Sequence, residues 1–93
     1  MNYDEYKMAL EETKKIFDSI DFVYYIENSR TLDDLRNALE ERFDFTEITN
    51  NPYMQGSLFN VVSDSEFMDY IEERYKGKYG FQEYTTYDII KVK

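Results

Sequence analysis

The side chains most able to do chemistry in this 93-residue chain are its carboxylates, which number 20 against 11 Lys and Arg. Two acidic doublets, Asp33-Asp34 and Glu40-Glu41, lie seven residues apart in the stretch LDDLRNALEERF. Paired carboxylates can act as general acid and base in glycoside hydrolysis, but one of them needs a raised pKa inside a cleft. These doublets fall on the predicted solvent-facing side of a helix, so we expect a protein that is not an enzyme.

Other catalytic and metal-binding chemistry lacks its usual side chains. The chain contains neither His nor Cys, which removes the common general base near neutral pH, the commonest zinc ligands and the common nucleophile-base pairs. No D-x-[DN]-x-[DN]-G calcium loop occurs, and carboxylates on helices cannot wrap one ion as a loop can. The sequence therefore predicts no catalytic residue, no cofactor and no metal site.

The overall charge points to the kind of partner. A formal charge of -9 argues against direct binding to nucleic acid or to an anionic membrane, because both need a positive footprint. We therefore expect the binding partner to be a basic protein, whose charge would complement that of this chain. The polar N-terminal stretch MNYDEYKMALEETKK resembles no targeting signal, and no apolar run approaches the ~18 residues of a membrane span. We expect one domain over residues 1–93, located in the cytoplasm.

Three amphipathic helices, over residues 3–20, 32–43 and 64–75, should position most of the carboxylates. Their apolar residues recur in steps of three and four, as on one face of a helix. Capping boxes begin the second helix, with Thr31 and Asp34, and the third helix, with Ser63 and Glu66. The residues expected on the core-facing sides are Tyr3, Tyr6, Leu10, Thr13, Phe17, Ile20, Leu32, Leu35, Ala38, Leu39, Phe43, Phe67, Met68, Ile71 and Tyr75.

Short runs of β-branched and aromatic residues predict the strands. Residues 57–62, 81–84 and 86–92 read as strands, and residues 22–26 read either as a strand buried on both faces or as a continuation of the first helix. Residues 49–56 carry turn chemistry around an Asn-Pro pair. These elements predict an α+β domain, in which three amphipathic helices pack on a small, mainly antiparallel sheet of three to four strands.

The acids on each helix recur every seven residues, about 10.5 Å along a helix axis, so they form rows. Residues 1–73 have a formal charge of -12, whereas residues 74–93 have one of +3. Duplex DNA also presents ordered lines of negative charge, so a rigid body with such rows could occupy a phosphate-binding track. The carboxylates expected to stand in for phosphates are Asp4, Glu5, Glu11, Glu12, Asp18, Asp33, Asp34, Glu40, Glu41, Glu66, Asp69, Glu72 and Glu73.

The aromatic content supports an alternative function. Ten Tyr and seven Phe exceed the needs of one small core, and Tyr is favoured at interfaces because it is large, stiff and polar at its tip. Candidates for contacts with a partner or within a homodimer come from Tyr3, Tyr24, Tyr25, Tyr53 and Tyr79, and we expect Tyr24, Tyr25 and Tyr53 to form the interface. In this alternative the chain is an acidic adapter or regulatory subunit that binds through a Tyr-rich patch, and the acidic doublets are ordinary solvated helix faces.

The chain resembles a known class of viral protein in its small size, its acid rows and its abundance of Tyr, Phe, Asn, Ile and Lys. The stretch with the strongest resemblance is SRTLDDLRNALEE. This class comprises the small acidic DNA mimics with which bacteriophages block host restriction enzymes, including the anti-restriction proteins of T-even phages. The resemblance is one of character over most of the chain. It implies a non-enzymatic inhibitor, often dimeric, that occupies the DNA site of a host nuclease or other defence protein in the host cytoplasm.

Overall fold

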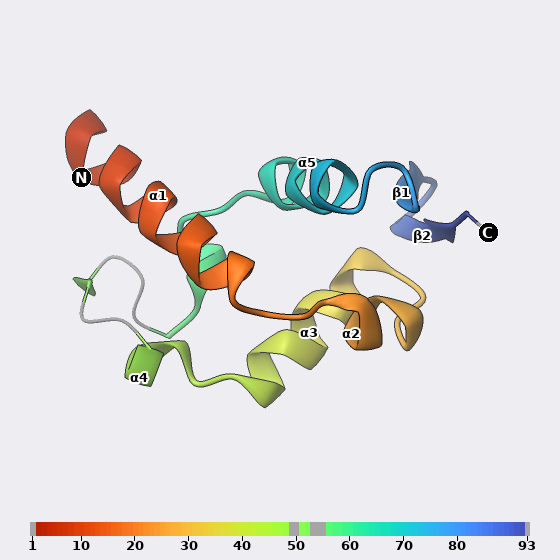
Figure 1. Ribbon diagram of the computed structural model, residues 1–93, viewed down its shortest axis with the longest axis horizontal. Helices are drawn as coiled ribbons and strands as arrows, with labels where there is room; N and C mark the ends of the chain where they lie inside the picture. The colour runs from red at the N-terminus through yellow and green to blue at the C-terminus, as the bar shows by residue number, and fades with distance from the viewer. Residues whose placement is uncertain (1, 49–50, 53–55, 93) are drawn as a thin grey trace.

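The computed structural model describes residues 2–48, 51–52 and 56–92. The described part of the chain is an α+β fold with one two-stranded antiparallel sheet. Figure 1 shows helix α1 crossing one end of the molecule, with α5 and the hairpin along one side and α2, α3 and α4 along the other. The elements are α1 (Tyr3–Asp18), α2 (Val23–Glu27), α3 (Leu32–Arg42), α4 (Phe45–Ile48), the 3-10 turn η2 (Leu58–Asn60), α5 (Asp64–Arg74), β1 (Tyr79–Glu83) and β2 (Tyr87–Lys91).

The three predicted amphipathic helices are confirmed, and each ends one or two residues earlier than expected. Both capping boxes form: the side chain of Thr31 accepts from the Asp34 backbone N–H at 3.2 Å, and that of Ser63 accepts from the Glu66 backbone N–H at 3.1 Å. In each box the acid accepts from the backbone N–H of the cap residue in return. These reciprocal bonds satisfy amide groups that a helix start leaves without partners.

Aromatic rings from four segments form the core. The ring of Phe17 lies 5.7 Å from that of Phe22, 6.0 Å from that of Phe59 and 5.5 Å from that of Phe67, measured between centroids. The pairs Phe17–Phe22, Phe22–Phe67 and Phe59–Phe67 are edge-to-face, the arrangement favoured by the ring quadrupoles. Phe17, Phe22 and Phe67 are each at most 1% exposed. This cluster therefore holds α1, α2, η2 and α5 together.

The predicted core-facing stripe of α1 is correct over its second half and wrong at its start. Thr13, Phe17 and Ile20 are buried, and the Thr13 hydroxyl satisfies its hydrogen bond by donating to the Ala9 carbonyl at 2.8 Å. Tyr3, by contrast, is 75% exposed. In Figure 1 the first turns of α1 extend beyond the elements that cover its second half, so a side chain of the first turn has little to pack against.

The prediction of a strand over residues 22–26 is wrong, because this segment forms the separate short helix α2. Phe22 and Ile26 are both fully buried, while Tyr24 between them is 69% exposed. A spacing of four residues places two side chains on one helix face. The Ile26 N–H accordingly donates to the Phe22 carbonyl at 2.8 Å. The alternative of a longer first helix is also wrong, since α1 ends at Asp18.

The predicted strand over residues 57–62 is also wrong, because the segment contains the turn η2. Leu58, Phe59, Val61 and Val62 are all buried. A strand sends successive side chains to opposite faces, whereas a tight turn can direct all four toward one core. The predicted loop over residues 49–56 falls largely outside the described residues. The short helix α4 before it, which buries Phe45, was not expected.

The two C-terminal strands are confirmed as one hairpin, with Phe81 opposite Ile89. Helix α5 contacts β1, and α3 contacts β2. The Ile89 N–H donates to the Arg30 carbonyl at 2.9 Å, and Thr31 forms an isolated bridge with Asp88. Among the described residues the sheet has two strands, not three or four, because two of the predicted strands are helical. The hairpin consequently covers one end of an aromatic core, and no broad sheet forms beneath the helices.

Tyr79 was among the candidates for partner contacts, and this prediction is wrong, because the side chain is buried and links the hairpin to α2. Its environment also predicts a loss of stability in alkali. Tyr79 is 1% exposed, and its hydroxyl donates to Glu27 Oε1 at 2.8 Å. Burial, followed by the hydrogen bond and charge of Glu27, raises the pKa of Tyr79 to about 12. Unfolded tyrosine ionises near pH 10, so the unfolded chain binds fewer protons than the folded one between these values. The contribution of Tyr79 to stability should be constant below about pH 9.5 and fall as the pH rises toward 12.

Urea unfolding between pH 8 and 11.5 tests this expectation with Tyr79→Phe. The variant should lose roughly 1.5–3 kcal/mol at pH 8, because it removes a hydrogen bond to a carboxylate, and its stability should fall less steeply above pH 10. Tyr84→Phe is the control, because Tyr84 is 68% exposed. An unchanged alkaline slope in Tyr79→Phe would contradict the role given to this hydroxyl.

Candidate interaction surfaces

The outer face of α3 carries an acidic row, of which one member, Glu40, is paired with Arg36. Leu35 and Leu39 are fully buried and orient the helix, which turns the polar positions to solvent. The row continues through α4 and the residue before it. All its acids are exposed: Asp33, Asp34, Glu40, Glu41, Asp44 and Glu47. We call this set the α3 acidic face.

The two arginines of α3 are drawn away from most of these carboxylates. Arg36 Nη1 donates to Asp64 Oδ1 at 2.7 Å, and its guanidinium lies 5.0 Å from the centroid of the Phe59 ring. Arg36 Nη2 also lies 4.0 Å from Oε1 of Glu40, one member of the acidic face. The guanidinium of Arg42 lies 5.5 Å from the centroid of the Phe43 ring. Most of the negative charge on this face is therefore uncompensated by α3's own cations.

Helix α5 has a comparable outer face. Phe67 and Ile71 are fully buried, and the helix turns a second row of acids away from the core. Asp69, Glu72 and Glu73 are exposed and Glu66 is half-buried. Glu66 is also used locally, since it completes the capping box and accepts from the Tyr6 hydroxyl at 3.2 Å.

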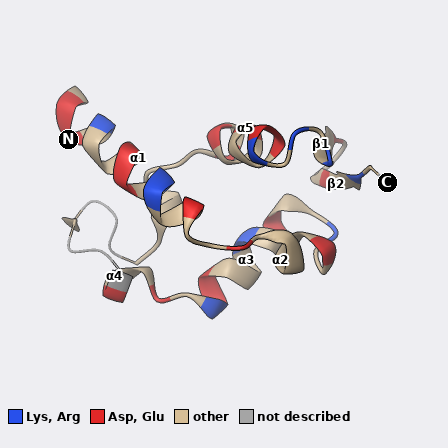
Figure 2. Cartoon of the chain, in the orientation of Figure 1, with Lys and Arg blue, Asp and Glu red and all other residues tan. Residues whose placement is uncertain are grey.

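The acids of α1 are mixed with bases. Asp4, Glu5, Glu11 and Asp18 are exposed, and Glu12 is half-buried, where it accepts from Asn51 Nδ2 at 3.4 Å. Three exposed lysines share the helix surface with them, and the alternation of colours along α1 is visible in Figure 2. These lysines are Lys7, Lys14 and Lys15. With five acids against three lysines, α1 has a formal charge of -2, and its acids alternate with bases instead of forming an unbroken row.

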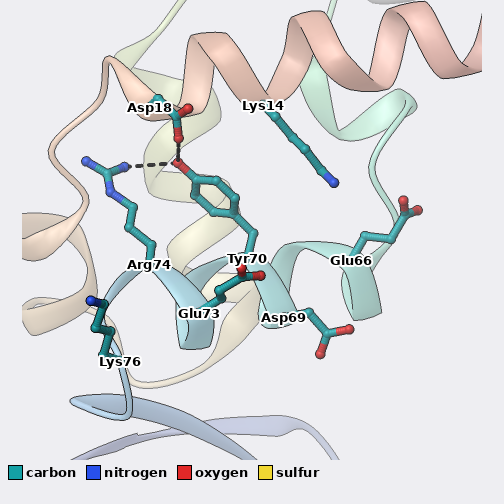
Figure 3. A pocket seen from close by; sticks show the side chains of 8 residues that line it. All are labelled: Lys14, Asp18, Glu66, Asp69, Tyr70, Glu73, Arg74 and Lys76. Atoms are coloured by element: carbon teal, nitrogen blue, oxygen red, sulfur yellow. Dashed lines mark hydrogen bonds between the residues drawn. The ribbon is translucent and has the colours of Figure 1, made fainter.

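The predicted rows do not all share one surface. Helices α3 and α5 lie along opposite sides of the molecule in Figure 2, because both bury their apolar faces in the core between them. The rows of α1 and α5 do meet, in an open groove of about 630 Å³ that Figure 3 shows from close by. Its acids are Asp18, Glu66, Asp69 and Glu73. The α3 acidic face takes no part in this groove.

Three cations balance the acids of the groove, namely Lys14, Arg74 and Lys76. A chain of hydrogen bonds crosses it: the Tyr70 hydroxyl donates to Asp18 Oδ1 at 2.6 Å and accepts from Arg74 Nη1 at 3.3 Å (Figure 3). Burial, reinforced by the hydrogen bond to Asp18, raises the pKa of Tyr70 well above its ordinary value of 10. The phenol therefore stays protonated near neutral pH, and the network ties α1 to α5.

The predicted aromatic candidates are placed in part. Tyr24 is 69% exposed, and Tyr25 is half-buried against the ring of Phe43, with centroids 5.9 Å apart. Tyr53 lies outside the described residues. Tyr24 and Tyr25 line a hollow of about 430 Å³ together with Glu41. The structure thus joins one of the predicted phosphate-mimicking acids to the two described tyrosines, which the sequence had suggested for separate roles.

Sequence reasoning did not single out Tyr70 and Arg74 as residues that shape the groove. Their spacing of four residues places them side by side on α5, but nothing in the sequence indicates that both would meet Asp18 on another helix. Lys14 and Lys76 were equally missed as groove residues. Each is an exposed lysine, which by type alone is an ordinary surface residue.

Comparisons with protein-family models, with curated proteins and with solved structures found no match for this chain. Within the described residues, no group of three or more carboxylates is arranged to hold a metal ion. None of the helices in that part of the chain combines the length and apolarity needed to cross a membrane.

Arg74 is the residue of the groove on which stability should depend most. Its Nη1 donates to the Phe17 carbonyl at 2.9 Å, and its guanidinium lies 5.3 Å from the centroid of the Phe22 ring. Arg74→Met should lower the free energy of unfolding by about 2–3 kcal/mol, because it removes the hydrogen bonds to the Phe17 carbonyl and the Tyr70 hydroxyl and the cation-aromatic contacts. Lys76→Met removes the same charge from the exposed rim and should change stability little. Equal losses in the two variants, measured by urea unfolding, would contradict this assignment.

Proposed function

We propose that this protein is a non-enzymatic DNA mimic, which inhibits a nuclease or another defence protein of a host cell by occupying its DNA-binding site. The observation that carries the proposal is the α3 acidic face, six exposed carboxylates in a stretch whose two arginines turn largely toward other partners. The resemblance to the anti-restriction proteins of T-even phages supports the same function. A basic DNA-binding protein is the partner, and the chain contacts no nucleic acid itself.

A mimic must present its charges from a rigid support, since flexible carboxylates lose conformational entropy on binding. The α3 acidic face meets this need over most of its length, because Leu35 and Leu39 anchor the helix and the Thr31 capping box fixes its start. The long dimension of the molecule, 38 Å, is close to one turn of duplex DNA, about 34–36 Å. The acids of α5 would offer a second row on the opposite side.

The test is competition with DNA. A panel of purified host restriction nucleases, assayed for cleavage of duplex DNA, should contain one that the protein inhibits. Added non-cleavable duplex should displace the inhibitor, and raising salt should weaken the complex because screening reduces both steering and attraction. An inhibitor that DNA fails to displace at any salt concentration would remove the proposal.

Charge reversal locates the inhibitory surface. The first variant combines Asp33→Lys, Glu40→Lys and Glu41→Lys and keeps the capping residue Asp34. It should weaken inhibition by roughly tenfold or more. The same number of reversals on α5, at Asp69, Glu72 and Glu73, changes the net charge equally and should weaken inhibition less. Urea unfolding of both variants separates lost affinity from lost folding. Equal losses of inhibition would show that total charge acts, not the α3 acidic face.

A second candidate function is favoured by the exposed aromatic surface at Tyr24, which is 69% exposed. In this case the protein is an acidic adapter or regulatory subunit, and its tyrosines form the contact with a partner or with a second copy of the chain. Such binding would survive high salt, because burial of apolar surface is not screened as charge is. Sedimentation of the free protein at low and high salt measures the self-association directly.

A further inference from the structure

The hollow beside α2 is built from two tyrosine rings at right angles. The rings of Tyr24 and Tyr25 meet edge to face, with centroids 5.4 Å apart and an interplanar angle of 89°. Tyr25 is held in turn by Phe43, whose ring stacks on that of the fully buried Phe45 at 6.1 Å. The exposed ring of Tyr24 is thus supported by a series of rings that reaches the core, and the aromatic wall is anchored there.

The other walls of the hollow supply hydrogen-bond acceptors. Glu41 brings an exposed carboxylate, and Asn28 brings a side-chain amide. The Nδ2 group of Asn28 donates to the Tyr24 carbonyl at 2.8 Å, and the amide oxygen of Asn28 is a further acceptor. A volume of about 430 Å³ admits a long side chain. Aromatic faces with a nearby carboxylate are the chemistry that attracts an organic cation.

The structure already contains a cation at this position. Arg42 lines the same hollow, and its guanidinium lies 5.5 Å from the centroid of the Phe43 ring. This distance is within the range of a cation-aromatic contact, about 6 Å. Arg42 contacts Phe43, the ring that supports Tyr25 and is not itself part of the lining. An incoming cation would therefore meet the two tyrosine rings and the repulsion of Arg42.

We propose that this hollow binds a lysine or arginine side chain of the basic partner, with Tyr24 and Tyr25 contacting the cation through their rings and Glu41 through its carboxylate. The inference rests on the proposed function in that the partner is a basic protein. Glu41 belongs both to the hollow and to the α3 acidic face, so the two are continuous. The acidic face would steer the partner, and the hollow would anchor one of its side chains. The lining of the hollow holds one acid and one base, so the choice of a cationic occupant rests on the tyrosine rings, on the adjoining α3 acidic face and on the chain's formal charge of -9.

Nuclear magnetic resonance titration of the full chain tests the site without the partner. The probes are the blocked peptides acetyl-Gly-Arg-Gly-amide and acetyl-Gly-Lys-Gly-amide, with acetyl-Gly-Glu-Gly-amide and acetyl-Gly-Leu-Gly-amide as controls at equal ionic strength. The basic peptides should shift the resonances of Tyr24, Tyr25, Asn28 and Glu41, with a millimolar Kd. Shifts spread evenly over α3 and α5, or equal shifts with the acidic or apolar peptide, would overturn the proposal.

Three variants test whether the ring of Tyr24 binds the cation and whether Arg42 competes with it. Tyr24→Leu should weaken binding of the arginine peptide severalfold, whereas Tyr24→Phe keeps the ring and should retain it. Arg42→Met removes the cation that competes for the hollow and should strengthen binding. Weakened binding in Arg42→Met, or equal affinity in Tyr24→Leu and the unaltered protein, would overturn the proposal. Far-ultraviolet circular dichroism confirms that each variant is folded.

The outcomes also distinguish this site from the proposed function. If the basic peptides bind in the hollow while duplex DNA fails to displace the inhibitor from any nuclease, the DNA-mimic function falls and the cation site stands. If DNA competes but the peptides show no preference for the hollow, the cation site falls and the DNA mimic stands. Loss of both would leave the acidic face as an ordinary solvated surface.

Discussion

The packing of Phe17 against rings from three other segments is the contact on which the rest of the structure depends. Phe22, Phe59 and Phe67 surround it within 6.0 Å between centroids. A chain of this size buries only about 60–65% of the surface its unfolded form exposes. A few large rings must therefore supply much of the apolar burial. Segments whose local sequence favours a strand accordingly turn as helices or tight turns, since these conformations direct their rings into the cluster.

The same core also takes up two of the chain's arginines. Arg36 and Arg74 extend their guanidinium groups toward buried rings, where each also finds an oxygen acceptor, on Asp64 and on the Phe17 carbonyl respectively. Arginine suits such sites because its planar group can stack on a ring and donate hydrogen bonds at the same time. The surface is acidic because the chain has 20 carboxylates against 11 Lys and Arg. Arg36 also pairs with Asp64 and Glu40, so it neutralises carboxylates while it contacts the core.

The predictable parts of the fold were those governed by local chemistry. The capping boxes at Thr31 and Ser63 are pairs three residues apart, and both begin helices where the sequence placed them. The two C-terminal strands were also predicted, and the structure shows that they pair with each other as a hairpin. The segments over residues 22–26 and 57–62 were mispredicted because β-propensity depends on finding a neighbouring strand. Their apolar side chains are drawn instead into a core that contains rings from distant parts of the chain.

By itself the sequence determined three amphipathic helices, their starts, and the outward position of their carboxylates, because the helical period and the capping pairs act over a few residues. Only the tertiary structure decided which carboxylates meet. It placed the rows of α3 and α5 on opposite sides, joined Asp18 of α1 to α5 through Tyr70, and set Glu41 beside Tyr24 and Tyr25. The physical reason is that each helix orients itself by burying its own apolar stripe. The direction of its charged face relative to the other helices then depends on contacts between residues far apart in the chain.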